Sequence, residues 1–215
     1  AEIINPGRSA RFDQYVTAYY TMRQRRGLTR FDAERQLKTH NVYGMMMVEM
    51  DHADGLVSGL TAHYPETVRP ALQIIGKREG VRKIAGLYML VFKNQTIFIA
   101  DATVNIEPTA EDLAEIALLA AEKVRQLDIE PSVAMLSFSN FGGTKHPLAE
   151  KVRIATDLVK QRAPGLMVDG EMQADTAIVP EIISELYPFS SLKRPANVLI
   201  CPDLTSANIG YKLLA

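Results

Sequence analysis

The sequence predicts an α/β fold in which a three-layer, mostly parallel sheet has helices on both faces and includes one antiparallel hairpin. In the second half, the short apolar runs "SVAMLSF", "LMVDG" and "ANVLIC" alternate with helical segments. Strands this apolar are typical of a parallel sheet that is buried on both faces. Two further β-rich runs, "KIAGLYMLVF" and "TIFIA", are separated only by "KNQ", which predicts the antiparallel hairpin.

The first fifty residues predict three helices, over residues 9–25, 31–39 and 42–50. Gly27 follows the first helix and is a natural point for it to end. Apolar side chains recur along that helix at a spacing that places them on one face. They are Phe12, Tyr15, Val16, Tyr19 and Met22.

The next segment predicts a strand, a turn of small residues and a helix. Leu56 and Val57 indicate a short buried strand, and the helix is expected over residues 65–75, beginning at a proline. A helix N-terminus after such a turn can hold a phosphorylated ligand, and the guanidinium of Arg69 could bind two of its oxygens. Alternatively, Arg69 only pairs with Glu66 three residues earlier. The residues alone leave both interpretations open.

The rest of the chain alternates helix and strand. The clearest helix is "EPTAEDLAEIALLAAEKVRQL", where Thr109 and Asp112 have the spacing of a capping box. Further helices are expected at "HPLAEKVRIATDLVKQRA", "ADTAIVPEIISEL" and "TSANIGYKLLA". We expect residues 1–215 to form one region, cut at both ends from a longer protein, with a subdomain split near residues 76–80.

The balance of charged residues argues against functions that need a strong overall electrostatic field. The chain has 24 lysines and arginines against 25 acidic residues in 215, so nothing favours nucleic acid or an anionic membrane. No apolar run approaches the ~20 residues that cross a bilayer, and the N-terminus lacks the pattern of a secretory signal. We therefore expect a soluble cytoplasmic protein that binds neither nucleic acid nor membrane.

Cysteine and histidine positions argue against a metal site. The only cysteine, Cys201, lies in the apolar run "NVLIC" and predicts a buried structural thiol rather than a nucleophile. The histidines His40, His52, His63 and His146 have no paired metal-ligand spacing. We expect no metal and no cofactor within this region.

Candidate ligand-binding residues follow the predicted strands, because ligands of open α/β sheets bind beyond the carboxyl ends of the strands. The turn "SNFGGTKHP" has the small residues of a phosphate cradle, although its spacing matches neither the dinucleotide nor the Walker motif. A simple glycine turn, or acids that only cap the next helix, are the alternatives. The candidates in these clusters are Thr61, His63, Arg69, Ser137, Ser139, Asn140, Gly142, Asp169 and Asp203.

Six segments together resemble the phosphate acetyltransferase family over nearly the whole chain. They are "DGLVSG", "TVRPALQIIG", "EPTAEDLAEIAL", "EPSVAMLSFS", "DGEMQADTAIVP" and "ANVLICPDLTSANIGYK". The resemblance implies a two-domain α/β fold of the isocitrate and isopropylmalate dehydrogenase-like type, which dimerises and moves acetyl between coenzyme A and phosphate. It also implies that Arg23 and Arg69 match two arginines of the interdomain cleft, which favours ligand binding by Arg69.

Other segments look more like the phosphate acetyltransferase-like C-terminal region of the large bacterial NADP-dependent malic enzymes. They are "NPGRSARFDQYVTAYY", "SNFGGTKHP", "FIADATVNIEP" and "SSLKRPANVLI". Tyr64 and Pro65 also stand where the transferases have small residues. This likeness implies acetyl-CoA or coenzyme A as ligand, with NADP and a divalent metal only in an upstream malic domain. It further implies a dimer through this region and a larger assembly with the malic domains.

Two functions are therefore weighed. The first is a regulatory module, in which acetyl-CoA shifts the population of states of an attached malic domain. The second is a working transferase that moves acetyl between coenzyme A and phosphate. The family's catalytic serine, arginine and aspartate belong to a segment beyond "GYKLLA", so no catalytic residue is assigned in this chain. From the sequence we expect the regulatory function, with the transferase as the alternative and a domain kept only for dimerisation as a third reading.

Overall fold

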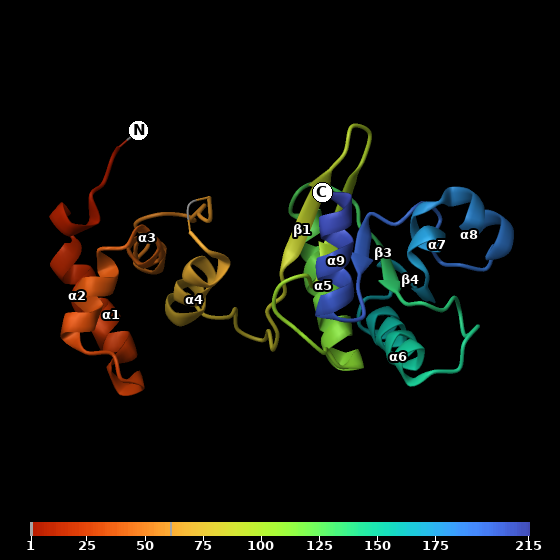
Figure 1. The fold of residues 1–215 in the computed structure, drawn as a ribbon, viewed down its shortest axis with the longest axis horizontal. Helices are drawn as coiled ribbons and strands as arrows, with labels where there is room; N and C mark the ends of the chain where they lie inside the picture. The colour runs from red at the N-terminus through yellow and green to blue at the C-terminus, as the bar shows by residue number, and fades with distance from the viewer. Residues whose placement is uncertain (1, 61) are drawn as a thin grey trace. The chain divides into compact units, whose positions relative to one another are not determined.

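The computed structural model describes residues 2–60 and 62–215. The chain divides into two compact units, Ala1–Val81 and Arg82–Ala215. The first unit is helical and the second contains the sheet (Figure 1). Within the described ranges, no helix is long and apolar enough to cross a membrane.

The helical unit is built around the apolar face predicted for its first helix. Tyr15, Val16 and Tyr19 are buried there and pack with Leu37 and Met46 in one cluster. The elements are η1 (Pro6–Arg8), α1 (Phe12–Arg23), η2 (Gln24–Arg26), α2 (Arg30–Leu37), α3 (His40–Glu49) and α4 (Tyr64–Ile74). Helix α1 packs on α2, and α3 packs on α4.

The strand predicted around Leu56 and Val57 is wrong. Residues 51–60 form no strand, and Val57 is fully exposed. Leu56 instead covers Gly44 of α3, where a Cβ atom would lie 2.8 Å from the Leu56 Cδ1 atom. Two apolar residues are a very short strand, and the described part of this unit offers no strand to pair with its backbone groups.

The second unit contains a five-stranded sheet in the order β1-β2-β5-β3-β4. Its strands are β1 (Leu87–Val91), β2 (Thr96–Ala100), β3 (Ser132–Leu136), β4 (Met167–Met172) and β5 (Val198–Ile200). Strands β1 and β2 pair antiparallel, and every other pair is parallel. The predicted mostly parallel sheet with one hairpin is confirmed.

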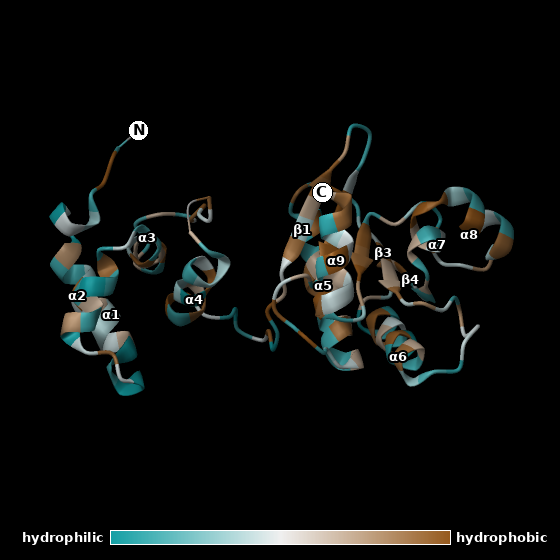
Figure 2. Cartoon of the chain, viewed as in Figure 1, coloured by the Kyte–Doolittle hydropathy of each residue, from teal (hydrophilic) through white to brown (hydrophobic). Residues whose placement is uncertain are grey.

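Helices cover both faces of this sheet, as the apolar strands predict. They are α5 (Ala110–Arg125), α6 (Pro147–Arg162), α7 (Ala174–Ile178), α8 (Pro180–Leu186) and α9 (Leu204–Leu214). Alternate residues of β2 enter different cores: Phe98 and Ala100 pack with α5 and α6, whereas Ile97 and Ile99 pack with α7, α8 and α9. Figure 2 shows hydrophobic residues along the strands and a mixed surface on α6.

The single helix predicted over "ADTAIVPEIISEL" is wrong, because the chain forms two short helices there. Helix α7 ends at Ile178, Val179 is extended (φ −97°, ψ 110°), and α8 begins at Pro180. Proline lacks the N–H that a continuing helix needs, whereas it fits the first position of a new one. Pro180 therefore starts a helix instead of continuing one.

The pairing of β3 with β4 contains a bulge. Met135 lies opposite Gly170 and Leu136 lies opposite Met172, so Glu171 is an extra residue in β4. A Cβ atom at Gly170 would lie only 2.6 Å from the carbonyl oxygen of Met135, and Gly170 has φ 151°. A bulge changes the direction in which the side chain of the extra residue points. The extra residue here is Glu171.

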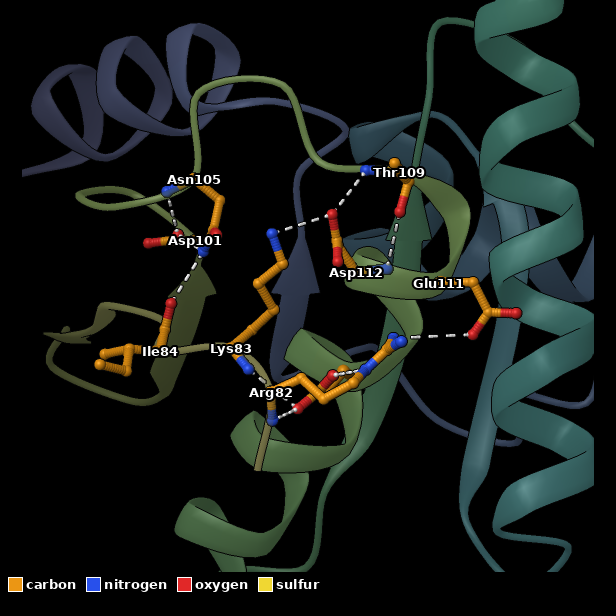
Figure 3. A network of polar contacts seen from close by, with 9 residues as sticks. Arg82, Lys83, Ile84, Asp101, Asn105, Thr109, Glu111 and Asp112 are labelled. Atoms are coloured by element: carbon orange, nitrogen blue, oxygen red, sulfur yellow. Dashed lines mark hydrogen bonds and ion pairs between the residues drawn. The ribbon is translucent and has the colours of Figure 1, made fainter. Parts of the chain in front are cut away.

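The start of the second unit is fixed to α5 by an ionic network (Figure 3). Glu115 accepts the backbone N–H groups of Arg82 (2.6 Å) and Lys83 (3.0 Å). The Lys83 Nζ atom lies 3.2 Å from Asp112 Oδ2, and Asp112 also completes the capping box with Thr109. The capping box predicted from the sequence is confirmed, and it belongs to this network.

Candidate functional site

A mainly apolar pocket of about 470 Å³ lies where β3 and β5 end and α6 and α9 begin. Its apolar walls include Leu136, Leu148 and Leu199. Pockets of this size that combine apolar walls with a few polar groups are typical ligand sites. Its position at the carboxyl ends of parallel strands is the one expected for an open α/β sheet.

The polar groups of the strand-end pocket come from three elements. Ser137 follows β3, and its N–H donates to the carbonyl of Met172 (2.8 Å). Asp203 caps α9 by accepting the N–H of Ser206 at 2.7 Å. Lys151 of α6 also lines the pocket and donates to the carbonyl of Pro202 at 2.8 Å. Ser137 and Asp203, both predicted from the sequence, therefore line one pocket.

Cys201 also lines the strand-end pocket, but its thiol is poorly suited to attack. Burial, with a contribution from Asp203, raises the pKa of the Cys201 thiol to about 12. The nucleophilic form is the thiolate, which such a pKa keeps scarce near neutral pH. The prediction of a buried structural thiol is confirmed.

The turn after β3 holds three of the predicted residues against the end of β4. Ser139 donates its hydroxyl to Glu171 Oε1 (3.3 Å), and the Gly142 N–H donates to the same oxygen (2.5 Å). Asn140 accepts the Gln173 N–H at 2.7 Å and donates its own amide to Gln173 Oε1 at 3.0 Å. These contacts fix the turn, and Gly142 supplies its left-handed position (φ 81°).

Asp169 is occupied by internal partners. It accepts hydrogen bonds from the Lys160 ammonium (2.6 Å), the Ser190 hydroxyl (2.8 Å) and the Ser191 N–H (2.7 Å). Burial raises the pKa of Asp169, but the Lys160, Ser191 and Ser190 hydrogen bonds outweigh it and hold the pKa below its ordinary value. These contacts tie β4 to α6 and to the segment after α8.

Three of the remaining predicted residues lie in the helical unit. Arg23 is the last residue of α1 and is half-buried. His63 caps α4, and its N–H lies 3.3 Å from Glu66 Oε2. Arg69 is exposed on α4, and no ion pair joins it to Glu66 or to any other described residue. The predicted Thr61 lies outside the described residues.

The structure thus gathers the predicted residues into groups rather than into one site. Ser137 and Asp203 share the strand-end pocket, whereas Arg23 and Arg69 belong to the helical unit. Their roles toward a ligand stay predictions. Lys151, which lines the strand-end pocket, was not predicted, and Glu171, an acid that follows the predicted "LMV" strand, holds the turn although it was not among the predicted ligand-binding residues. Gly170 within a strand is a sequence signal for the bulge that orients Glu171.

Comparison with known proteins gives one matching family and relatives of two kinds, malic enzymes and phosphate acetyltransferases. Residues 1–215 match the family described as Phosphate acetyl/butaryl transferase. The chain is 44% identical over 214 residues to the NADP-dependent malic enzyme of Escherichia coli, covering 99% of this chain and 28% of that protein. It is 41% identical over 221 residues to the phosphate acetyltransferase of Thermoanaerobacterium thermosaccharolyticum, covering 100% of this chain and 67% of that protein.

The fold agrees with these relatives. A solved phosphotransacetylase from Streptococcus pyogenes superimposes with a TM-score of 0.87 at 43% identity, covering 98% of this chain and 64% of that one. The chain thus spans about two thirds of these two transferases and 28% of the Escherichia coli malic enzyme, and it is homologous to the C-terminal region of the malic enzymes. The resemblance read from the sequence is confirmed: this chain belongs to the phosphate acetyl/butaryl transferase family.

Proposed function

We propose that this chain is part of an acyltransferase that moves an acetyl group between coenzyme A and phosphate. The observation that carries the proposal is the 41% identity to a phosphate acetyltransferase across this entire chain and 67% of that enzyme. The strand-end pocket supports it, because it offers a mainly apolar chamber of about 470 Å³ whose lining includes hydroxyl, carboxylate and ammonium groups. A thioester with a long flexible arm suits such a chamber.

In this proposal the thiol of coenzyme A gives up its proton to solvent, and its sulfur attacks the carbonyl carbon of acetyl phosphate. The new C–S bond forms as the C–O bond to phosphate breaks, and the electron pair leaves with the phosphate. Positioning both reactants supplies much of the acceleration, and cationic groups stabilise charge on the departing phosphate. We assign Arg23 and Arg69 to the phosphates of the ligand, since both are charged and neither forms an ion pair with a described residue.

A second candidate is a regulatory domain, and the 44% identity to a malic enzyme over 99% of this chain favours it. Acetyl-CoA would then bind without turnover and shift the population of states of an attached malic domain. NADP and a divalent metal would belong to that domain, outside this region. In both candidates we place the protein in the cytoplasm as a homo-oligomer with no nucleic-acid or membrane partner.

An assay with matched binding measurements separates the two candidates. The full-length protein is given acetyl phosphate and coenzyme A, and formation of acetyl-CoA is followed by absorbance. The transferase proposal expects saturable turnover. Thermal unfolding with acetyl-CoA is measured in parallel, because a ligand that binds only the folded state raises the melting temperature. Stabilisation without turnover would leave the regulatory candidate, and neither effect would overturn both.

A further inference from the structure

A second pocket, of about 450 Å³, is formed by α8 and the segment between α8 and β5. It shares no lining residue with the strand-end pocket, and Figure 1 shows α8 on the side of the sheet unit that is farther from α9. The residues that line this α8 pocket are Pro180, Ile183, Ser184, Tyr187, Pro188, Leu192, Lys193, Arg194 and Pro195. The proposed acyl transfer uses none of them.

The buried part of the α8 pocket is apolar. Ile183 and Leu192 are 7% and 3% exposed, and both belong to the core that α7, α8 and α9 form on one face of the sheet. The Tyr187 ring packs against Phe141, with 5.0 Å between the ring centroids. An apolar cavity of about 150 Å³ is large enough to hold benzene. The α8 pocket therefore has room for a hydrocarbon group of that size and for a polar group beside it.

Hydrogen bonds hold the segment after α8 on both sides of the two basic residues of the pocket. On one side, the Ser190 hydroxyl accepts the N–H of Leu192 at 3.2 Å. On the other side, the Ala196 N–H donates to the carbonyl of Ala177 at 2.8 Å. A pocket whose walls are fixed in this way is largely pre-formed, so a ligand loses little free energy in ordering it.

The two basic residues of the α8 pocket carry charges that no carboxylate balances. The Lys193 Nζ atom donates to the carbonyl of Ser190 (2.8 Å), and the Arg194 Nη2 atom donates to the carbonyl of Glu130 (3.0 Å). A carbonyl positions a cation but leaves its charge in place, and neither side chain forms an ion pair with a described residue. The lining contains no acidic residue. The α8 pocket therefore favours an anionic ligand.

The prolines of the α8 pocket favour a carboxylate over a phosphate. Three exposed prolines line it, Pro180, Pro188 and Pro195, and none of them has the backbone N–H group with which proteins usually cradle phosphate. A carboxylate has only two oxygens, and one donor from each of the two basic side chains satisfies both. Guanidinium groups in particular match the geometry of a carboxylate.

We infer that the α8 pocket binds a small monocarboxylate whose apolar body is about as large as a benzene ring. The hydrocarbon part lies against Ile183 and Leu192, and the carboxylate accepts hydrogen bonds from Lys193 and Arg194. Both parts of the ligand are needed, because the apolar body excludes water from the ion pairs and thereby strengthens them. This inference does not depend on acyl transfer, because binding alone expresses it.

Amide NMR titration of the full, isotope-labelled chain near neutral pH tests the ligand class. Sodium benzoate is the probe, and it is compared at equal ionic strength with benzamide, which lacks the charge, and with acetate, which lacks the ring. We expect benzoate to shift the amide signals of Leu192, Lys193 and Arg194 and to bind there about tenfold or more tightly than either competitor, as a lost charged hydrogen bond implies. Equal binding of benzoate and benzamide, or benzoate shifts confined to residues outside the α8 pocket, overturns the inference.

Phenyl phosphate in the same titration tests the choice of head group. We expect it to bind the α8 pocket more weakly than benzoate does, and tighter binding would refute the preference for a carboxylate. The titrations contain no coenzyme A, so their results are separate from that of the transferase assay.

Variants at exposed positions locate the site without disturbing the core. Lys193→Gln and Arg194→Gln should each lower the preference for benzoate over benzamide by about threefold or more. Ser184→Phe places a ring in the α8 pocket and should weaken both ligands alike. Lys123→Gln, at an exposed lysine of α5, is the matched control and should change neither. An unchanged preference in both basic-residue variants would refute the role of the charges, and unchanged benzoate affinity in Ser184→Phe would refute the location.

Discussion

Asp169 and Lys160 form an ion pair, with 2.6 Å between Oδ1 and Nζ, that joins the centre of β4 to α6; the Asp169 side chain is buried and the Lys160 side chain is partly exposed. The other carboxylate oxygen of Asp169 accepts from Ser190 and Ser191, so one side chain connects three segments of the sheet unit. A contact of this kind predicts a specific loss of stability when it is broken.

Asp169→Asn should lower the free energy of unfolding of the sheet unit by about 2–3 kcal/mol, because Lys160 loses its partner and the bonds to Ser190 and Ser191 weaken. Urea denaturation followed by circular dichroism measures this. Asp157→Asn, which touches only an exposed pair with Arg153, is the control and should change stability by less than about 0.5 kcal/mol. Equal effects of the two substitutions would contradict the assignment.

The stability of the sheet unit should fall as the pH drops below the ordinary Asp pKa of 3.8. The pKa of Asp169 is lowered in the folded state, so the folded protein binds fewer protons than the unfolded chain in that range, and acid favours unfolding. Denaturation midpoints measured from neutral pH down to about pH 3 check the sign. Asp169→Asn should flatten this dependence, and a profile identical to that of the natural chain would disprove the contribution.

Glu115→Ala should release the start of the sheet unit from α5. The N–H groups of Arg82 and Lys83 lose their shared acceptor, so both amides should exchange with solvent faster. Hydrogen exchange read by mass spectrometry or NMR measures this directly. Glu111→Ala removes an exposed carboxylate of the same helix and should leave the Lys83 amide unchanged. Undiminished protection in Glu115→Ala would show that other contacts hold the segment.

Arg69→Ala should weaken the binding of coenzyme A esters by about 1.5–3 kcal/mol, the range for a lost charged hydrogen bond. The reason is that Arg69 is exposed on α4 without an ion pair in the described chain, which leaves its guanidinium available for phosphate. Titration with acetyl-CoA measures the change. Arg25→Ala, an exposed arginine of η2 that no proposal uses, is the control. Unaltered affinity would show that Arg69 does not contact the ligand.

Cys201 should react slowly with alkylating reagents in the folded protein. Burial raises its pKa to about 12, so almost none of the thiol is ionised near neutral pH. Iodoacetamide labelling, quantified by mass spectrometry with and without denaturant, tests this. We expect labelling to accelerate at least tenfold on unfolding, where the pKa returns to about 8.5. Rapid labelling of the folded chain would show that the thiol is accessible and ionised.

Much of the sheet unit could be predicted because its local signals agree with one another. The hairpin, the buried apolar strands and the capped helix at Thr109 each combine a hydrophobic pattern with suitable turn or cap chemistry. The strand around Leu56 and Val57 was predicted from hydrophobicity alone, but a strand also needs a neighbouring strand to pair with its backbone groups. Pro180 carried the correct signal for a helix start, but the apolar pattern on both sides of it suggested one continuous helix.

The candidate site was less predictable because it depends on register. Asp169 and Glu171 are both acids at the end of one predicted strand, and nothing in their spacing shows that only Glu171 holds the turn. The bulge against β3 separates their roles, and it is visible only once the two strands are paired. Lys151 was missed for a similar reason, since its link to Pro202 crosses 51 positions of the chain.

The close approach of Gly170 to the carbonyl of Met135 limits what sequence change this strand can accept. Any larger residue at position 170 would collide with the backbone of β3. The collision would shift the Glu171 side chain and, with it, the turn that Glu171 holds. Substitution of Gly170 should therefore impair both folding and ligand binding, although glycine has no side chain that could contact a ligand.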